Sequence, residues 1–438
     1  MHRFLHLFLL SLIMVMSSPG RINAQEGFVQ VKGEGFIIRG NPYHFLGTNF
    51  WYGMNLGSRG PGGDRPRLLR ELDRLKSMGI NNLRIMGGSE GPDSAPWRMV
   101  PSLQPSPGIY NQDVLNGLDF LLSEMHKRGM YAVVCLNNFW DWSGGFGQYI
   151  VWSGEADKIP YPPPSPGGNW QTYQEFAAGF YSNPKAQALF EQFIHFIIGH
   201  INPYTGKTYR DDPTIMAWEL ANEPRGINNV PAFLKWIDQT AGFIKSLDSH
   251  HLVTTGSEGD TPSPSTAGND FYLDHSSKYI DYTTIHIWVQ NWGMYNPADA
   301  EHTYGPALKY ALNYLSDHEK IARQLGKPLV MEEFGLSRDH NVFTPGSPVT
   351  IRDQYYSSLF KAIYERASIN KSVVAGCNFW AWAGEGRADK AGDYWKPGNA
   401  FIGDPAHEPQ GWYSVFDTDT STIRIIQEFA RKMNSIGK

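Results

Sequence analysis

The chain has 438 residues, a formal net charge of −5 and a sequence pI of about 6.3. This length can bury a large core and suits a barrel with insertions. There is no basic run, which argues against nucleic acid and anionic membrane surfaces as partners.

Residues 1–24 have the composition of a secretory signal peptide. A short basic start precedes an apolar run at 7–16 that is too short to span a membrane, and small residues at 22–24 offer a cleavage point. We therefore expect a soluble secreted protein, extracellular or periplasmic, with one catalytic domain over 25–438. A monomer is the default expectation.

The rest of the chain alternates between strand and helix patterns. Short antiparallel strands are predicted between 28 and 45, as a hairpin that closes the floor of a barrel. Apolar runs predict parallel strands at 45–50, 81–86, 130–136, 215–223, 252–256, 281–288, 329–334 and 373–382. Helical spacing predicts helices at 66–78, 111–128, 184–201, 231–247, 304–325, 351–367 and 422–433. This alternation predicts an α/β fold, a (β/α)8 TIM barrel with long βα loops.

Two of these strands run into a carboxylate. In the first, Pro224 cannot donate to a strand ladder and should end the strand, which leaves Glu223 at its carboxyl end. The second ends in Glu332-Glu333-Phe334-Gly335. A parallel barrel keeps its chemistry at this end, and two such carboxylates suit glycoside hydrolysis. The alternative for Glu223 alone is a solvated side chain in a turn.

Long Gly- and Pro-rich loops at 139–181 and 384–412 carry many of the 14 tryptophans, a composition that indicates a surface for stacking sugar rings. The only cysteines, Cys135 and Cys377, lie in separate strand patterns, so two buried free thiols are predicted rather than a disulfide.

Several blocks of the sequence resemble glycoside hydrolase family 5, and within it the endo-β-1,4-mannanase subfamily. The matching text is GTNFWY from Gly47, LRIM around Arg84, SGGFGQYIVWSG from Ser143, DDPTIMAWELANEPR from Asp211, IDYTTIHIW from Ile280, MEEFG from Met331 and NFWAWAGEGR from Asn378. Together these blocks cover nearly all of the chain after the predicted signal, in order.

The resemblance implies cleavage of β-1,4-linked mannan with retention of configuration, without cofactor or metal. Glu223 matches the acid/base and Glu333 the nucleophile. Glu332 is expected on the opposite side of the strand, because successive side chains alternate. A raised pKa is expected for Glu223 in the free enzyme, since it must hold a proton for the first step.

Further substrate-binding residues follow from the same resemblance. Arg84 matches an arginine beside the nucleophile, Asn222 a residue that binds the sugar 2-hydroxyl, and Arg225 a contact on the leaving-group side. The remaining candidates line the cleft or lie near the cleaved sugar: Trp51, Asn138, Trp140 or Trp142, His286, Trp288, Trp292 and Trp380.

One position departs from the wider family, in which a tyrosine two residues after the strand-six histidine is hydrogen-bonded to the nucleophile. Here that position is Trp288, so the orientation of Glu333 is open. Two alternatives to a mannanase are kept: a β-1,4-glucanase of the same family, and a carbohydrate-binding barrel without catalysis. The intact pair of glutamates argues against the second.

Overall fold

Eight parallel strands form the centre of the computed structural model, which describes residues 27–437. They are β4 (Phe45–Asn49), β5 (Asn82–Met86), β6 (Tyr131–Cys135), β7 (Ile215–Glu219), β8 (Leu252–Thr254), β9 (Thr283–Ile287), β10 (Leu329–Phe334) and β11 (Val374–Phe379). Each strand lies beside its neighbour in sequence, and β11 pairs with β4. Between β8 and β9, Asp281 N donates to Val253 O at 2.8 Å, which brings the two ends of the sheet together. The predicted (β/α)8 barrel is confirmed.

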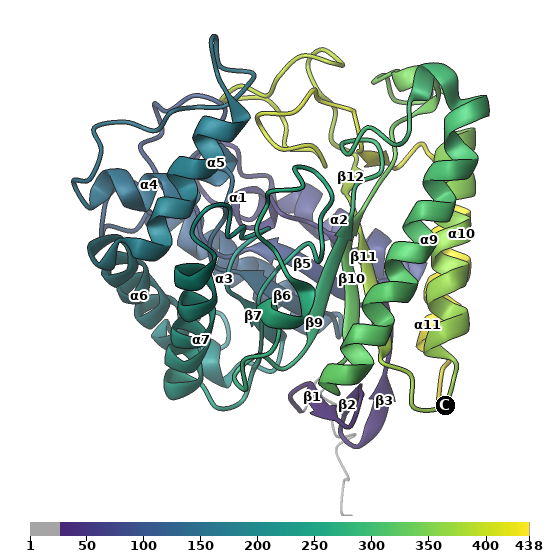
Figure 1. Ribbon diagram of the computed structural model, residues 1–438, viewed down its shortest axis with the longest axis horizontal. Helices are drawn as coiled ribbons and strands as arrows, with labels where there is room; N and C mark the ends of the chain where they lie inside the picture. The colour runs from purple at the N-terminus through teal and green to yellow at the C-terminus, as the bar shows by residue number, and fades with distance from the viewer. Residues whose placement is uncertain (1–26, 438) are drawn as a thin grey trace, which may run out of the picture.

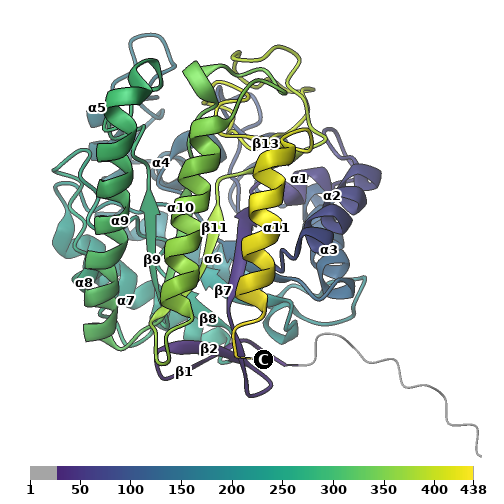
Figure 2. The same cartoon turned by 90° about the vertical axis from the view of Figure 1, so that its right-hand side faces the viewer.

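Helices surround this barrel and run beside its strands (Figures 1 and 2). They are α2 (Arg65–Met78), α3 (Gln112–Lys127), α6 (Pro184–Gly199), α7 (Val230–Leu247), α8 (Phe271–Asp274), α9 (Ala300–Leu325), α10 (Thr350–Ala367) and α11 (Thr420–Asn434). The helix α2 shows why such boundaries are readable: Asp64 accepts from Arg67 N at its start, and Gly79 ends it with a left-handed φ of 93°. The short α8 had no predicted counterpart.

A three-stranded sheet covers the amino-terminal end of the barrel. It consists of β1 (Gln30–Lys32), β2 (Gly35–Ile38) and β3 (Asn41–Tyr43), drawn at the bottom of Figure 1. Phe36 contacts Tyr282 with ring centroids 5.4 Å apart, and Val330 and Ala375 belong to the same buried cluster. The predicted floor is therefore present, with a third strand added to the hairpin.

The opposite end carries the long insertions (Figure 1). The short helix α1 (Gly53–Leu56) follows β4, and the predicted loop 139–181 contains α4 (Gly145–Trp152) and α5 (Trp170–Ala178). The eighth barrel strand is shorter than predicted, because Trp382–Gly384 leaves the barrel as β12 and pairs with β13 (Val415–Phe416). Cys135 and Cys377 are buried and free, as predicted.

The sequence analysis made two predictions about membranes and export. Within residues 27–437, no helix combines the length and apolarity that crossing a membrane requires. The predicted signal segment, residues 1–24, lies outside the described part of the chain.

Candidate active site

Glu223 lies at the carboxyl end of the barrel, four residues beyond the end of β7. The chain stays extended past Glu219, since Asn222 N donates to Asn137 O and Glu223 N to Gly256 O, at 2.9 and 3.0 Å. Glu223 itself has a φ of 51°, a conformation uncommon outside glycine. Such backbone geometry gathers at functional sites, where the surrounding structure holds it.

Glu333 faces Glu223 from the end of β10. One oxygen of each carboxylate and one nitrogen of His286 all lie within 4.8 Å of one another. His286 Nδ1 lies 2.7 Å from Glu223 Oε1 and 3.4 Å from Glu333 Oε2. The two glutamates that the sequence singled out are therefore adjacent, with one imidazole between them.

A β-bulge changes the expected direction of Glu332. In the pairing of β10 with β9, Met331 lies opposite Ile285 and Glu333 opposite His286, so Glu332 is an extra residue. As a result Glu332 does not point to the opposite side. Its Oε2 lies 3.8 Å from Arg84 Nε and 3.9 Å from His286 Nε2, inside the barrel and fully buried. The strand-alternation prediction was wrong here.

Arg84 organises the base of the site. Its guanidinium makes five hydrogen bonds: Nε and one Nη to Glu219, one to Asn222 Oδ1, one to Asn49 Oδ1 and one to Glu333 Oε1. A guanidinium has five N–H groups, so all of them are used. Arg84 thus holds the predicted nucleophile and the predicted 2-hydroxyl ligand in one fixed arrangement.

Trp288 replaces the family tyrosine as a donor to Glu333. Its indole Nε1–H donates to Glu333 Oε2 at 3.1 Å, and its ring packs edge-on against Trp380 with centroids 5.9 Å apart. An indole N–H can only donate, which suits an ionised carboxylate. The orientation of Glu333 left open by the sequence is therefore fixed by Arg84 and Trp288.

The environment of Glu223 favours its ionised form. Burial alone would raise the pKa of Glu223, but the hydrogen bond and positive charge of His286 outweigh it and lower the pKa to about 2. Trp140 Nε1 also donates to Glu223 Oε2 at 2.6 Å. The raised pKa expected for Glu223 in the free enzyme was wrong, because the sequence did not reveal that these two donors meet on this carboxylate.

The pKa values of Glu333 and His286 are shifted upward. Burial raises the pKa of Glu333 to about 7, with Glu223 adding to the rise and His286 and Arg84 opposing it. Burial would lower the pKa of His286, but the surrounding carboxylates raise it to about 10. Together these shifts favour a proton on His286 rather than on Glu223 in the free enzyme.

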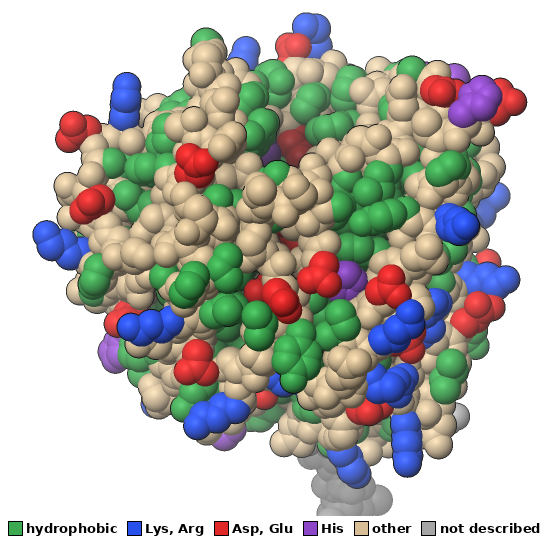
Figure 3. Space-filling view, viewed as in Figure 1, with side chains coloured by type: hydrophobic (Ala, Val, Ile, Leu, Met, Phe, Trp, Pro, Cys, Tyr) green, Lys and Arg blue, Asp and Glu red, His purple; other side chains and the backbone are tan. Residues whose placement is uncertain are grey.

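These residues open onto a cleft of 1310 Å³. In the space-filling view it is a hollow edged by hydrophobic side chains, with acidic side chains visible inside (Figure 3). Nine of the predicted candidates line it: Trp140, Trp142, Asn222, Glu223, Arg225, Trp288, Trp292, Glu333 and Trp380.

Four predicted residues are not among those lining the cleft. Trp51 is buried and donates its indole N–H to Gly403 O, and Asn138 accepts from Trp140 N and Asn222 Nδ2. Their direct contact with substrate stays a prediction. Arg84 and His286 lie behind the carboxylates and act on them.

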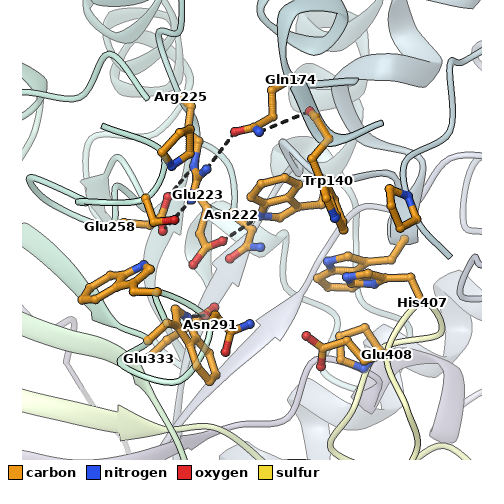
Figure 4. Close-up of a pocket in the computed structure, with 18 of the residues that line it drawn as sticks. Trp140, Gln174, Asn222, Glu223, Arg225, Glu258, Asn291, Glu333, His407 and Glu408 are labelled. Atoms are coloured by element: carbon orange, nitrogen blue, oxygen red, sulfur yellow. Dashed lines mark hydrogen bonds and ion pairs between the residues drawn. The ribbon is translucent and has the colours of Figure 1, made fainter. Parts of the chain in front are cut away.

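Several cleft residues were missed. Glu258 Oε2 accepts from Arg225 Nε at 2.7 Å, Gln174 Oε1 accepts from the same guanidinium at 2.8 Å, and the guanidinium stacks on Trp140 (Figure 4). His407 and Glu408 lie on the other side of the cleft in Figure 4. Only Glu258 carried a signal, as a carboxylate just past a predicted strand; the other three lie in long insertions.

The spacing of Glu223, His286 and Glu333 is one that a metal ion could also bridge. Each of these side chains already has protein hydrogen-bond partners. Two-carboxylate glycoside hydrolysis needs no metal.

Comparison with known proteins identifies what this chain resembles. A family model described as "GH family 5 beta-mannosidase-like" matches residues 26–438. A mannan endo-1,4-beta-mannosidase 5 from Solanum lycopersicum is 32% identical, over 87% of this chain and 88% of the relative. A mannan endo-1,4-beta-mannosidase 1 from the same plant is 31% identical, over 99% and 96% of the two chains.

Solved structures agree with this match. The crystal structure of a glycoside hydrolase family 5 mannosidase from Rhizomucor miehei is 42% identical, with a TM-score of 0.86 over 94% of this chain and 98% of that chain. A mutant of that mannosidase is known in complex with mannosyl-fructose. An endo-beta-1,4-mannanase from Thermotoga petrophila is 25% identical, with a TM-score of 0.65 over 90% and 78% of the chains.

Proposed function

The chain belongs to glycoside hydrolase family 5 and is a glycoside hydrolase, and from this premise we propose that it cleaves β-1,4-mannosidic linkages with retention of configuration. The observation that carries the proposal is the pair Glu223 and Glu333, whose nearest oxygens lie within 4.8 Å. Retaining enzymes hold their carboxyl groups about 5–5.5 Å apart, whereas inverting enzymes need about 6.5–9.5 Å. Mannan, glucomannan and galactomannan are the candidate substrates, since the curated relatives are named for mannan cleavage.

In the proposed mechanism Glu333 attacks the anomeric carbon while Glu223 protonates the leaving oxygen. Arg84 and Trp288 donate to Glu333 and stabilise its ionised form. Water activated by Glu223 then hydrolyses the glycosyl ester.

The proton for the first step reaches Glu223 from His286. In the free structure His286 Nδ1 and Glu223 Oε1 lie 2.7 Å apart, within hydrogen-bonding distance for direct transfer. A sugar that displaces water from the cleft makes the separated charges of this pair less favourable, because a drier site has a lower dielectric. The proton then moves to the carboxylate, which becomes the acid.

Stereochemistry and mutation test this function together. NMR of the first products from mannohexaose should contain the β-anomer, and Glu333→Ala should nearly abolish release while the thermal midpoint stays close to that of the wild type. An α-anomeric first product, or most of the rate surviving in Glu333→Ala, would remove the double-displacement mechanism. Faster hydrolysis of cellulose than of mannan would favour the glucanase alternative.

Endo cleavage is expected from the sequence resemblance, but one wall of the cleft favours a second candidate, removal of terminal mannose units. There the two long insertions meet, with the rings of Trp170 and His407 6.3 Å apart. Beside this contact, Glu408 Oε2 and His407 Nδ1 are buried without a hydrogen-bond partner among the described residues. Unpaired polar atoms in a cleft are suited to bind the hydroxyls of a chain end.

The early products of mannohexaose separate these candidates. Endo cleavage yields mannobiose, mannotriose and mannotetraose from the start. Terminal cleavage yields mannose and mannopentaose first, and Glu408→Gln should then slow mannobiose hydrolysis. Glu365→Gln, an exposed carboxylate on α10 that does not line the cleft, serves as the matched control.

We also propose that the protein is exported, on the composition of residues 1–24 alone. Amino-terminal sequencing of the protein recovered outside the cell tests this, with a mature end near residue 25 expected.

A further inference from the structure

Glu332 is a buried carboxyl group that the mechanism does not use. It lies directly beneath the reacting pair, because the bulge in β10 turns both Glu332 and Glu333 into the barrel. The charged and titratable side chains that face it are Arg84 from β5, Glu219 from β7, Tyr282 directly before β9, His286 from β9, and Glu333 on its own strand.

The hydrogen bonds around Glu332 are too few for an anion. Its Oε1 lies 3.2 Å from the Tyr282 hydroxyl, and its Oε2 has no hydrogen-bond partner. Two cations lie near Oε2. Arg84 already donates all five of its N–H groups to Glu219, Asn222, Asn49 and Glu333. His286 Nε2 lies 3.9 Å from Oε2, beyond hydrogen-bonding distance. An ionised carboxylate would be left in the barrel with one hydroxyl donor, an arrangement that buried charges avoid.

The surrounding charges argue in the same direction. Glu219 and Glu333 are hydrogen-bonded to Arg84, and Glu223 is paired with His286, so a further anion would have no cation of its own. Burial and the nearby negative charge of Glu219 raise the pKa of Glu332. A neutral acid satisfies the same geometry, because the Tyr282 hydroxyl can accept a hydrogen bond from a protonated Oε1 as well as donate one to an unprotonated oxygen.

We propose that Glu332 is protonated in the working enzyme and is a positioning residue, which as a neutral acid leaves Arg84 wholly committed to Glu219 and Glu333. Ionisation would draw the guanidinium toward Oε2, now 3.8 Å from Nε, and place a second negative charge beside the nucleophile. The role in catalysis rests on the proposed function, whereas the protonation of Glu332 does not.

Infrared difference spectra of the full chain test the protonation without substrate. Subtraction of Glu332→Gln from the wild type at pH 7 should show the loss of a carboxylic acid C=O band, and Tyr282→Phe should shift the same band. The matched control Glu219→Gln should show the loss of carboxylate bands, since Glu219 accepts two N–H groups from Arg84. Loss of carboxylate bands in Glu332→Gln would overturn the proposal.

The pH profile of kcat/KM tests the positioning role. Glutamine resembles the neutral acid, so Glu332→Gln should keep both limbs within about half a pH unit of the wild type. If Glu332 were ionised, its removal would lower the pKa of Glu333 and Glu223, and both limbs would move to lower pH. Inactivity of the wild type on every β-mannoside would defeat the proposed function and leave the infrared result standing.

Discussion

Trp288→Phe removes the indole donor to Glu333 and keeps an aromatic ring in place. The bond is 3.1 Å long, and both side chains are nearly buried, with 9% exposure for Trp288 and 2% for Glu333, so water cannot replace the donor easily. A hydrogen bond to a charged group contributes about 1.5–3 kcal/mol. If the ionised form of Glu333 loses this stabilisation, its ionised fraction, and with it kcat/KM, falls by about 10- to 150-fold at a pH below its pKa.

The same substitution should also shift the pH dependence of kcat/KM in one direction. Glu333 must be ionised to attack, and loss of a donor that favours the ionised form raises its pKa, by about 1–2 units for this free energy. The acid limb of kcat/KM should therefore move to higher pH.

The assay is the pH profile of kcat/KM on mannotriose, with the thermal midpoint as a check of folding. Trp288→Tyr is the matched control, because its hydroxyl supplies a donor and should recover part of the rate and of the acid limb. An acid limb in Trp288→Phe that coincides with that of the wild type, in a folded protein, would refute the assignment of this bond to the nucleophile.

Three other predictions concern the acid/base Glu223, the ion pair of Arg225 with Glu258, and the buried carboxyl group of Glu90. Glu223→Ala should cut kcat/KM on mannotriose by at least about 100-fold yet spare kcat/KM on an activated aryl mannoside, because that leaving group needs little protonation. Turnover of the aryl substrate at saturation should still slow, because Glu223 also activates water in the second step; equal losses of kcat/KM on both substrates would contradict the acid role. Arg225→Met leaves Glu258 buried without its cation and should lower the free energy of unfolding, measured by denaturant titration, by about 3–5 kcal/mol. The double variant Arg225→Met, Glu258→Gln should regain much of that lost free energy. Burial raises the pKa of Glu90 to about 7 in the folded protein. The folded state therefore binds more protons than the unfolded state between about pH 4.5 and 7, and stability falls as pH rises through this window. Glu90→Gln should make the thermal midpoint fall less steeply with pH, and an unchanged dependence of the midpoint on pH would exclude this contribution.

The barrel and its two principal carboxylates could be predicted because their signals are local. Apolar runs, helical spacing and the breaks at Pro224 and Gly335 each lie within a few residues of the element that they define. Long-range packing carried no such signal. Trp51 was predicted to line the cleft from its position after a strand. Its indole N–H instead donates a hydrogen bond to the carbonyl oxygen of Gly403, which is 352 residues away in sequence.

The protonation of the site was equally hidden. Glu223 was expected to have a raised pKa, yet that shift depends on where His286 and Trp140 reach across the barrel. Glu258 could have been suspected from its place after a strand, whereas Glu408 lies in a loop whose course no periodicity predicts.

The extra residue in β10 also bears on redesign of this enzyme. A regular strand points its side chains alternately to the barrel interior and to the surrounding helices, so a strand that kept both glutamates but lost the bulge would place Glu332 and Glu333 on opposite sides. An engineer who idealised this strand with Glu332 kept inside the barrel would therefore turn the attacking group, Glu333, away from the sugar.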